Sequence, residues 1–119
     1  MDTPENVAFL VSYLRTLKAP PAGTAHLRGR GVFENLGCAD CHAPPTYTSD
    51  RAYDVGVQDE NGHSKFNPPS LRGLRHRRHF FHDNRAVRLE DVFTHHKHPD
   101  GESPTGEELR NLLLFLRGL

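Results

Sequence analysis

The stretch Cys38-Ala39-Asp40-Cys41-His42 determines how the rest of this chain is interpreted. Its C-x-x-C-H spacing is the attachment signature of c-type haem. Two thiols at this spacing can form thioether bonds to the two vinyl groups of one porphyrin, and the adjacent histidine can bring an imidazole nitrogen to the iron. The sequence therefore predicts one covalent haem c, attached at Cys38 and Cys41, with His42 as an iron ligand.

Redox dithiols and zinc sites also use cysteine pairs of this spacing. A zinc site would need two further ligands at a matching spacing, and Cys38 and Cys41 are the only cysteines of the chain. A thioredoxin-like dithiol lies between a strand and a helix, whereas here a helical pattern ends before Cys38 and a proline-rich segment follows His42. The haem interpretation is favoured, and the redox dithiol is the main alternative.

Length and composition limit the chain to one compact domain. It has 119 residues, of which 35% are hydrophobic, and a formal net charge of zero. A neutral chain gives no reason to expect nucleic-acid binding. No stretch approaches the roughly 20 apolar residues of a membrane span.

The N-terminal residues lack the charged, apolar and small-residue layout of a secretion signal. Attachment of c-type haem takes place outside the cytoplasm, so we expect a periplasmic or otherwise extracytoplasmic protein. The missing signal then indicates a shortened chain or a domain cut from a longer protein, and we favour the second.

A first helix is predicted after Thr3-Pro4, which reads as an N-cap followed by proline at the first helical position. This segment echoes the last helix, residues 108–119. Residues 1–20 are therefore interpreted either as the tail of a preceding domain or as an extra helix of the cytochrome domain, residues 21–119. The predicted apolar face of the first helix consists of Val7, Leu10, Val11, Leu14 and Leu17.

A second helix is predicted from Ala25 to Leu36. Gly29 and Phe33 lie one turn apart on it, which favours a close crossing with the C-terminal helix. That last helix is predicted to begin with a capping box at Thr105-Gly106-Glu107-Glu108. Its expected buried residues are Leu109, Leu112, Leu113 and Leu116.

Residues 43–70 show no sustained period, which predicts a long irregular loop after the haem motif. Asn61-Gly62 indicates a small hairpin between residues 55–57 and Phe66. Six arginines then lie between Arg72 and Arg88, against the single acidic Asp83. This cluster suits an acidic redox partner or the haem propionates, with Arg72 as the best propionate candidate, and an ordinary charged surface is the alternative.

A short helix from Leu89 to Lys97 is predicted to supply the second iron ligand. Continuing its buried stripe by i+3, i+4 and i+7 leads to His96, whereas His95 is rotated by about 100° from it. Methionine, a common sixth ligand of haem iron, occurs only at Met1. His96 is therefore the predicted distal ligand.

From Gly29 onward the chain resembles the C-terminal cytochrome domain of the bacterial dihaem cytochrome c peroxidase and methylamine-utilisation haem protein family. The resemblance implies an all-α, cytochrome c-like domain wrapped around one haem, with long irregular loops, and with an axial ligand at the position of His96. It rests, besides the haem motif, on Pro69-Ser70-Leu71-Arg72, on Phe80-Phe81-His82-Asp83-Asn84, and on Leu89-Glu90-Asp91-Val92 followed by His96.

The resemblance also implies roles and departures. His82 belongs to the family's F/Y-F-H-D turn, so we expect it to form hydrogen bonds rather than to bind iron. Family members usually have glycine where Asn84 stands, which predicts a left-handed backbone there. Of the remaining histidines, His63, His76, His79 and His98 are expected at the surface.

The sequence thus favours a monohaem electron-transfer domain with His42 and His96 as axial ligands, served by a redox partner protein or a fused domain. The family uses two haems and this chain can attach one, so the resemblance supports haem binding better than peroxidase activity. Two other functions stay open. One is a haem peroxidase, or its electron relay, in which His96 dissociates, and the other is a ligand-gated haem sensor.

Overall fold

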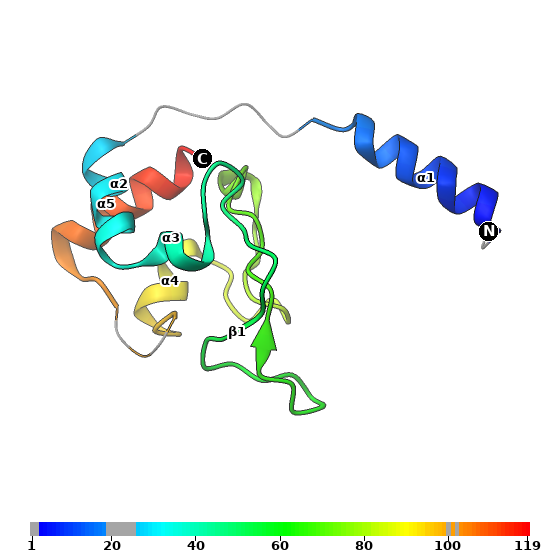
Figure 1. Ribbon diagram of the computed structural model, residues 1–119. Coiled ribbons are helices and arrows are strands. Elements are labelled where there is room, and N and C mark those ends of the chain that lie inside the picture. Colours follow the sequence, from blue (N-terminus) through cyan, green and yellow to red (C-terminus); the bar gives the residue numbers. More distant parts are fainter. Residues whose placement is uncertain (1–2, 19–25, 100, 102) are drawn as a thin grey trace.

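The computed structural model describes residues 3–18, 26–99, 101 and 103–119. Within these residues the chain is mostly helical or irregular, with two strands of two residues each (Figure 1). The expectation of a helical domain with long loops is confirmed to that extent. The elements are α1 (Pro4–Thr16), α2 (Leu27–Asn35), α3 (Cys38–Cys41), β1 (Tyr53–Asp54), β2 (Lys65–Phe66), the 3-10 helix η1 (Leu74–His76), α4 (Leu89–Thr94) and α5 (Gly106–Arg117).

The crossing of α2 and α5 depends on one glycine. A Cβ atom added to Gly29 would lie 2.0 Å from the carbonyl oxygen of Asn111 and 2.6 Å from Cβ of Phe115. Phe33, one turn later, is buried, and its ring centroid lies 5.3 Å from that of Phe115. The predicted close crossing is confirmed, and only glycine lets the two backbones approach this far.

The core is formed by residues of α2, η1, α4 and α5, together with Ala86 from the segment before α4. Helix α5 buries Leu112, Leu113, Phe115 and Leu116, of which the sequence pattern missed Phe115. The expected capping box is wrong, because the Thr105 side chain makes no capping hydrogen bond. The buried apolar cluster consists of Phe33, Leu74, Ala86, Leu89, Val92, Phe93, Leu112, Leu113, Phe115 and Leu116.

Helix α4 is shorter than predicted. It begins at Leu89 as expected but ends at Thr94 instead of Lys97. The amide of His96 bonds to the carbonyl of Asp91 at 2.9 Å, five residues earlier, and Lys97 has a φ of +53°. Both features belong to a wide terminal turn rather than to a continuing α-helix.

The hairpin exists, but its first strand lies earlier than predicted. Tyr53 pairs with Phe66 and Asp54 with Lys65, so residues 55–57 belong to the loop rather than to the strand. Gly62 has a φ of +81°, and the Asp59 carboxylate accepts the amides of Asn61 and His63, both at 2.9 Å. The acidic residue therefore stabilises a turn.

Helix α1 begins where the sequence predicted. Thr3 accepts a hydrogen bond from the amide of Asn6 at 3.2 Å, and Pro4 occupies the first helical position. No residue of α1 is buried, and Figure 1 shows it apart from the other helices. Among the described helices, none combines the length and apolar character that crossing a membrane requires.

Candidate haem site

The C-x-x-C-H motif lies on a single turn of helix. After α2, Gly37 adopts a left-handed backbone with φ of 78° and turns the chain into α3. The amide of His42 closes this turn by donating to the carbonyl of Cys38 at 2.9 Å. Cys38, Cys41 and His42 are all half-buried, and no disulfide joins the two cysteines.

The ring of His42 is held by a backbone carbonyl. Its Nδ1 lies 3.0 Å from the carbonyl oxygen of Tyr47. A carbonyl can only accept, so Nδ1 carries the proton and Nε2 keeps the lone pair that a metal needs. Burial lowers the pKa of His42, outweighing the carbonyls of Tyr47 and Pro69 that raise it, and nearby Arg77 lowers it further. His42 is therefore the neutral imidazole form that binds metals.

The two thiols are neutral and weakly acidic. Burial raises the pKa of Cys38 to about 11, and burial together with the neighbouring Asp40 carboxylate raises the pKa of Cys41. Reactive dithiols instead contain a thiol whose pKa is lowered, for example by a cationic neighbour. The raised pKa values of both thiols therefore argue against a reactive redox dithiol.

Two loops are bound to each other beside His42. The Thr48 hydroxyl donates to the carbonyl of Pro68, and the Ser70 hydroxyl donates to the carbonyl of Thr46. The Asn67 side chain donates to the carbonyls of Ser49 and Arg51 at 2.7 and 2.9 Å. These bonds fix the backbone on both sides of the ring, which gives the segment around Pro69-Ser70 a structural role.

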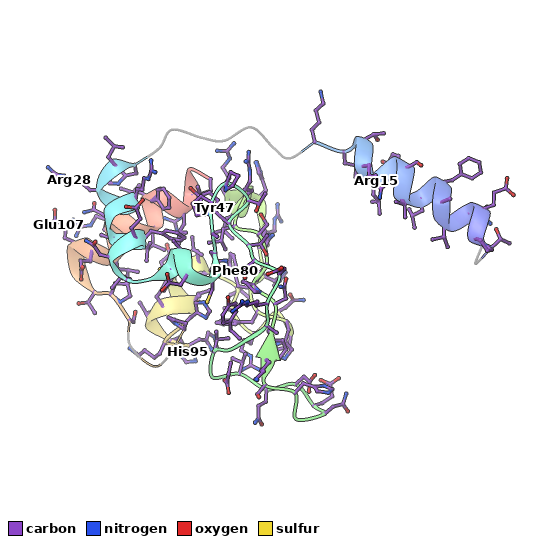
Figure 2. The ribbon with its side chains drawn as sticks, viewed as in Figure 1. Arg15, Arg28, Tyr47, Phe80, His95 and Glu107 are labelled. Atoms are coloured by element: carbon purple, nitrogen blue, oxygen red, sulfur yellow. The ribbon has the colours of Figure 1, made fainter. Side chains whose placement is uncertain are left out.

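Tyr47, labelled in Figure 2, anchors the first of these loops in the core, although no sequence pattern predicted this role. Its ring lies edge-on to Phe33 at 5.7 Å and to Phe115 at 6.3 Å. Its backbone is left-handed, with φ of 57°, which aims its carbonyl oxygen at His42. Tyrosine at a positive φ is an uncommon conformation that only tertiary packing sustains.

His96 and His95 lie in different environments, as the sequence predicted, but for another reason. His96 is half-buried and lies edge-on to Phe81, with ring centroids 5.1 Å apart, whereas His95 is exposed. Both residues follow α4, so the terminal turn and not the helical stripe directs the His96 ring inward.

The other histidines divide into buried and surface groups. His98 is half-buried, with its Nδ1 buried and its ring 5.8 Å from Phe81, so the expected surface position is wrong. His82 stacks on Phe66 at 4.6 Å, and its Nε2 lies 3.9 Å from the Asp83 carboxylate. Exposed positions are found for His63, His76 and His79.

The motif and the predicted distal residue border one apolar region. Cys38 and Phe81 both pack against the buried cluster that contains Val92 and Phe93 of α4, and Phe81 is the neighbour of His96. Across the described residues, no group of three or more histidine, cysteine or acidic side chains is arranged to hold a bare metal ion. The described thiols and imidazoles are therefore not clustered as a zinc site requires, whereas a haem could join the thiol pair and its adjacent imidazole to a second imidazole across an apolar region.

Comparison with known proteins agrees with this arrangement. A family model described as "Di-haem cytochrome c peroxidase" matches residues 32–111, which is more than half of the chain. This chain belongs to the di-haem cytochrome c peroxidase family. A relative is the methylamine utilization protein MauG of Methylorubrum extorquens, 34% identical over 84 residues, which cover 58% of this chain and 24% of MauG. The chain thus spans about a quarter of that relative's length, and no solved structure matches it.

This member of the di-haem cytochrome c peroxidase family has an arginine-rich surface close to His42. Arg77 donates to the carbonyl of Ser70 at 2.7 Å, next to the Pro69 carbonyl that faces the His42 ring. Arg72, the predicted propionate partner, is half-buried and donates to the Pro45 carbonyl at 3.4 Å.

Arg77 is one of the residues that line a pocket of mixed apolar and cationic character. Its one acidic residue, Glu90, pairs with Arg117 and lies 3.8 Å from Arg88. The hydrogen bonding of its own backbone and the Arg117 guanidinium lower the pKa of Glu90. The pocket is lined by Leu74, Arg75, Arg77, Phe80, Val87, Arg88, Leu89, Glu90 and Arg117.

Proposed function

We propose that this chain is a monohaem c-type electron-transfer domain with His42 and His96 as axial ligands. The observation that carries the proposal is the His42 ring, which burial keeps neutral and whose Nδ1 donates to the Tyr47 carbonyl, directly after the second of two thiols of raised pKa. One C-x-x-C-H motif allows one covalent haem c, attached at Cys38 and Cys41. When bound, this group supplies a one-electron couple at its iron.

Residues of this chain would set the reduction potential of that one-electron couple and keep peroxide from the iron. The Tyr47 carbonyl orients the His42 ring and increases its basicity, as outer-shell partners do for metal-bound histidines. His96, whose ring lies edge-on to Phe81, would be the second residue to hold the iron, which would leave no open site for peroxide. Two imidazoles stabilise ferric iron better than an imidazole and a thioether, so the reduction potential should lie below that of His/Met cytochromes.

Reduced-state spectroscopy tests the proposal. The ferrous protein, prepared with dithionite, should keep its low-spin spectrum when carbon monoxide is added. Denaturing mass spectrometry should show one haem retained on the chain. Quantitative release of the haem into acidified organic solvent would show that the attachment is wrong.

A second candidate is a peroxidase or its electron-relay domain, supported by the family's description and by the MauG relative. It requires His96 to dissociate, or a second haem elsewhere to carry out the chemistry. Carbon monoxide binding to the ferrous protein, or peroxide turnover of around 1 per second or faster, would favour it or the sensor alternative. Turnover far below that rate would favour electron transfer.

We also infer an acidic redox partner and an extracytoplasmic location. The pocket that Arg77 helps to line suits a carboxylate with an apolar neighbour, because four of its nine lining residues are arginines and four are apolar. The location follows from where c-type haem is attached. Co-sedimentation of the haem-loaded chain with candidate acidic cytochromes or cupredoxins at low and high salt tests the partner.

A further inference from the structure

Phe81 combines an unfavourable backbone conformation with a partly buried ring. Its φ of 71° lies in the left-handed region, which bulky side chains rarely occupy. Such a conformation persists only where the surrounding structure imposes it, and it occurs most often at functional sites. The ring packs against the buried apolar cluster. The backbone of Phe81 therefore indicates that its ring is needed in one particular direction.

The preceding residue, Phe80, shows that burial alone does not require this backbone. Phe80 packs against the same apolar cluster without a positive φ. The two residues differ in what they contact. Phe80 lines the arginine-containing pocket, whereas the Phe81 ring contacts two imidazoles, those of His96 and His98. The left-handed backbone of Phe81 therefore serves its contact with the histidines rather than its burial.

Backbone hydrogen bonds hold the turn that carries Phe81. Phe80 and Ala86 form a β-bridge across the turn, in which the amide of Phe80 donates to the carbonyl of Ala86 at 2.8 Å. Ala86 is only 1% exposed, so this end of the turn is anchored in the core. The amide of Asn84 donates to the carbonyl of Phe81 at 3.3 Å. These bonds fix the backbone that directs the Phe81 ring.

The contact between Phe81 and His96 has the geometry that aromatic pairs prefer. The ring centroids lie 5.1 Å apart and the ring planes meet at 66°. This edge-on arrangement is favourable because the positive edge of one ring faces the negative face of the other. Rotation of the His96 ring about its bond to Cβ would change the angle between the planes and weaken the contact. Phe81 therefore favours one orientation of the His96 imidazole.

His96 differs from His42 in how its ring is held. Histidines that bind metals are usually oriented by an outer-shell hydrogen bond, which the Tyr47 carbonyl provides for His42. Within the described residues, no hydrogen bond reaches the His96 ring. Its other ring neighbour is His95, 4.7 Å away, which is exposed. Packing against Phe81 is therefore the contact that can orient the His96 ring from the apolar core.

We propose that Phe81 is a positioning residue that fixes the orientation of the His96 imidazole plane at the haem iron. The inference rests on the proposed function, in which His96 is the second axial ligand. With His42 held by a hydrogen bond and His96 held by packing, both imidazoles would keep one orientation in the ferric and the ferrous protein. Such preorganisation of the ligands suits a domain that transfers electrons without rearranging.

Proton NMR of the wild-type ferrous haem protein tests the contact without any substitution. Low-spin ferrous haem is diamagnetic, and its ring current shifts the protons of an axial imidazole strongly upfield. The His96 ring protons should show this shift and should give nuclear Overhauser contacts to the Phe81 ring. Unshifted His96 protons would overturn the proposed ligand and this inference with it. Shifted His96 protons without contacts to Phe81 would overturn this inference alone.

Electron paramagnetic resonance of the ferric protein measures the orientation itself, because the g values of low-spin haem depend on the angle between the two axial imidazole planes. Phe81→Leu removes the ring and keeps an apolar side chain. Its largest g value should move by more than the wild-type linewidth, and the signal should broaden because the His96 ring takes several orientations. Phe81→Tyr keeps the ring and should keep the wild-type g values.

Phe80→Leu is the matched control, because it makes the same change one residue earlier, against the same apolar cluster. In the described part of the chain Phe80 has no ring contact with a histidine, so this variant should lose stability without a shift in g values. Equal shifts in the two leucine variants, or unchanged g values in Phe81→Leu, would overturn the proposal. If Phe81→Leu does not mature, Phe81→Met takes its place, with the same expectation, and the wild-type NMR result still decides.

Discussion

The two adjacent histidines after α4 differ in a way that allows a sharp test. His96 is half-buried against Phe81, and His95 is exposed. If His96 binds the iron, His96→Ala should open the sixth position and give a high-spin or water-ligated ferric spectrum. The ferrous variant should then bind carbon monoxide. His95→Ala is the matched control and should leave both spectra almost unchanged.

Two other histidines are the rivals in this experiment. His98 shares the Phe81 contact and is half-buried, and His82 lies in the F-F-H-D turn but stacks on Phe66. His98→Ala and His82→Ala should preserve the low-spin spectrum. If either of them, rather than His96→Ala, opens the iron, the ligand has been assigned to the wrong residue.

The turn before α4 contains an ion pair whose effect can be measured directly. Arg85 donates to both carboxylate oxygens of Asp83, at 2.8 to 3.1 Å. Chiefly through these bonds, the pKa of Asp83 falls from 3.8 to about 2. A depressed carboxyl pKa adds stability that is present above the unfolded value and lost as the pH falls through the folded one. The stability that ionised Asp83 contributes should therefore be lost as the pH falls from about 4 to about 2.

Arg85→Gln should return the pKa of Asp83 to near its ordinary value of 3.8. Carbon NMR titration of the Asp83 carboxyl measures this shift. Arg88→Gln is the control, because Arg88 lies near Glu90 and not near Asp83. An unchanged Asp83 titration in Arg85→Gln would show that the hydrogen bonds seen here do not persist in solution.

Single residues also mark the limit of what the sequence could predict. The left-handed backbone expected at Asn84 is confirmed, with φ of 61°, because asparagine replacing glycine is a local signal. Tyr47 and Phe81 also have positive φ, at 57° and 71°, and no local signal predicts this for aromatic residues. Their conformations are imposed by contacts with distant parts of the chain.

Among the elements, the α2–α5 crossing gives the clearest prediction. Gly29→Ala would place a Cβ 2.0 Å from the Asn111 carbonyl oxygen, so the helices must separate. We expect a loss of about 1–3 kcal/mol in unfolding free energy, as for other overpacked cores. Guanidinium unfolding of the haem-loaded protein measures it.

Gly31→Ala is the matched control in the same helix. Nothing lies within 4 Å of a Cβ at Gly31, so alanine should stabilise the protein by roughly 0.5–1 kcal/mol through helix propensity. Equal effects at the two positions would mean that the crossing is not tight in solution.

The helices could be predicted from periodicity, while their ends and the loops could not. The apolar stripes of α2, α4 and α5 are local patterns, so the sequence located these elements. The end of α4 depends on a wide turn with Lys97 at positive φ, and the predicted helix ran past it. The loop bonds beside His42 join residues about 20 positions apart, such as Thr48 with Pro68, and such pairings leave no periodic trace.

For the whole molecule, the arrangement of charge matters more than its sum. The chain is formally neutral, yet a pocket next to the His42 loop carries four arginines and one glutamate. The electrostatic field of such a patch extends over roughly 10 Å at 0.1 M salt. The approach of a small anion should therefore depend on the charge of the patch rather than on the zero net charge of the chain.

Oxidation of the ferrous protein by ferricyanide measures this field, because the reagent is a trivalent anion. At low ionic strength the second-order rate constant should fall as salt is added, opposite to the trend for a cationic cobalt phenanthroline oxidant. Arg75→Gln combined with Arg88→Gln should lower the low-salt ferricyanide rate by about tenfold. The control pair, Arg28→Gln with Arg110→Gln, removes the same charge from α2 and α5 outside the pocket. If both double variants slow the reaction equally, the rate depends only on net charge, and the pocket is not the docking site of an acidic partner.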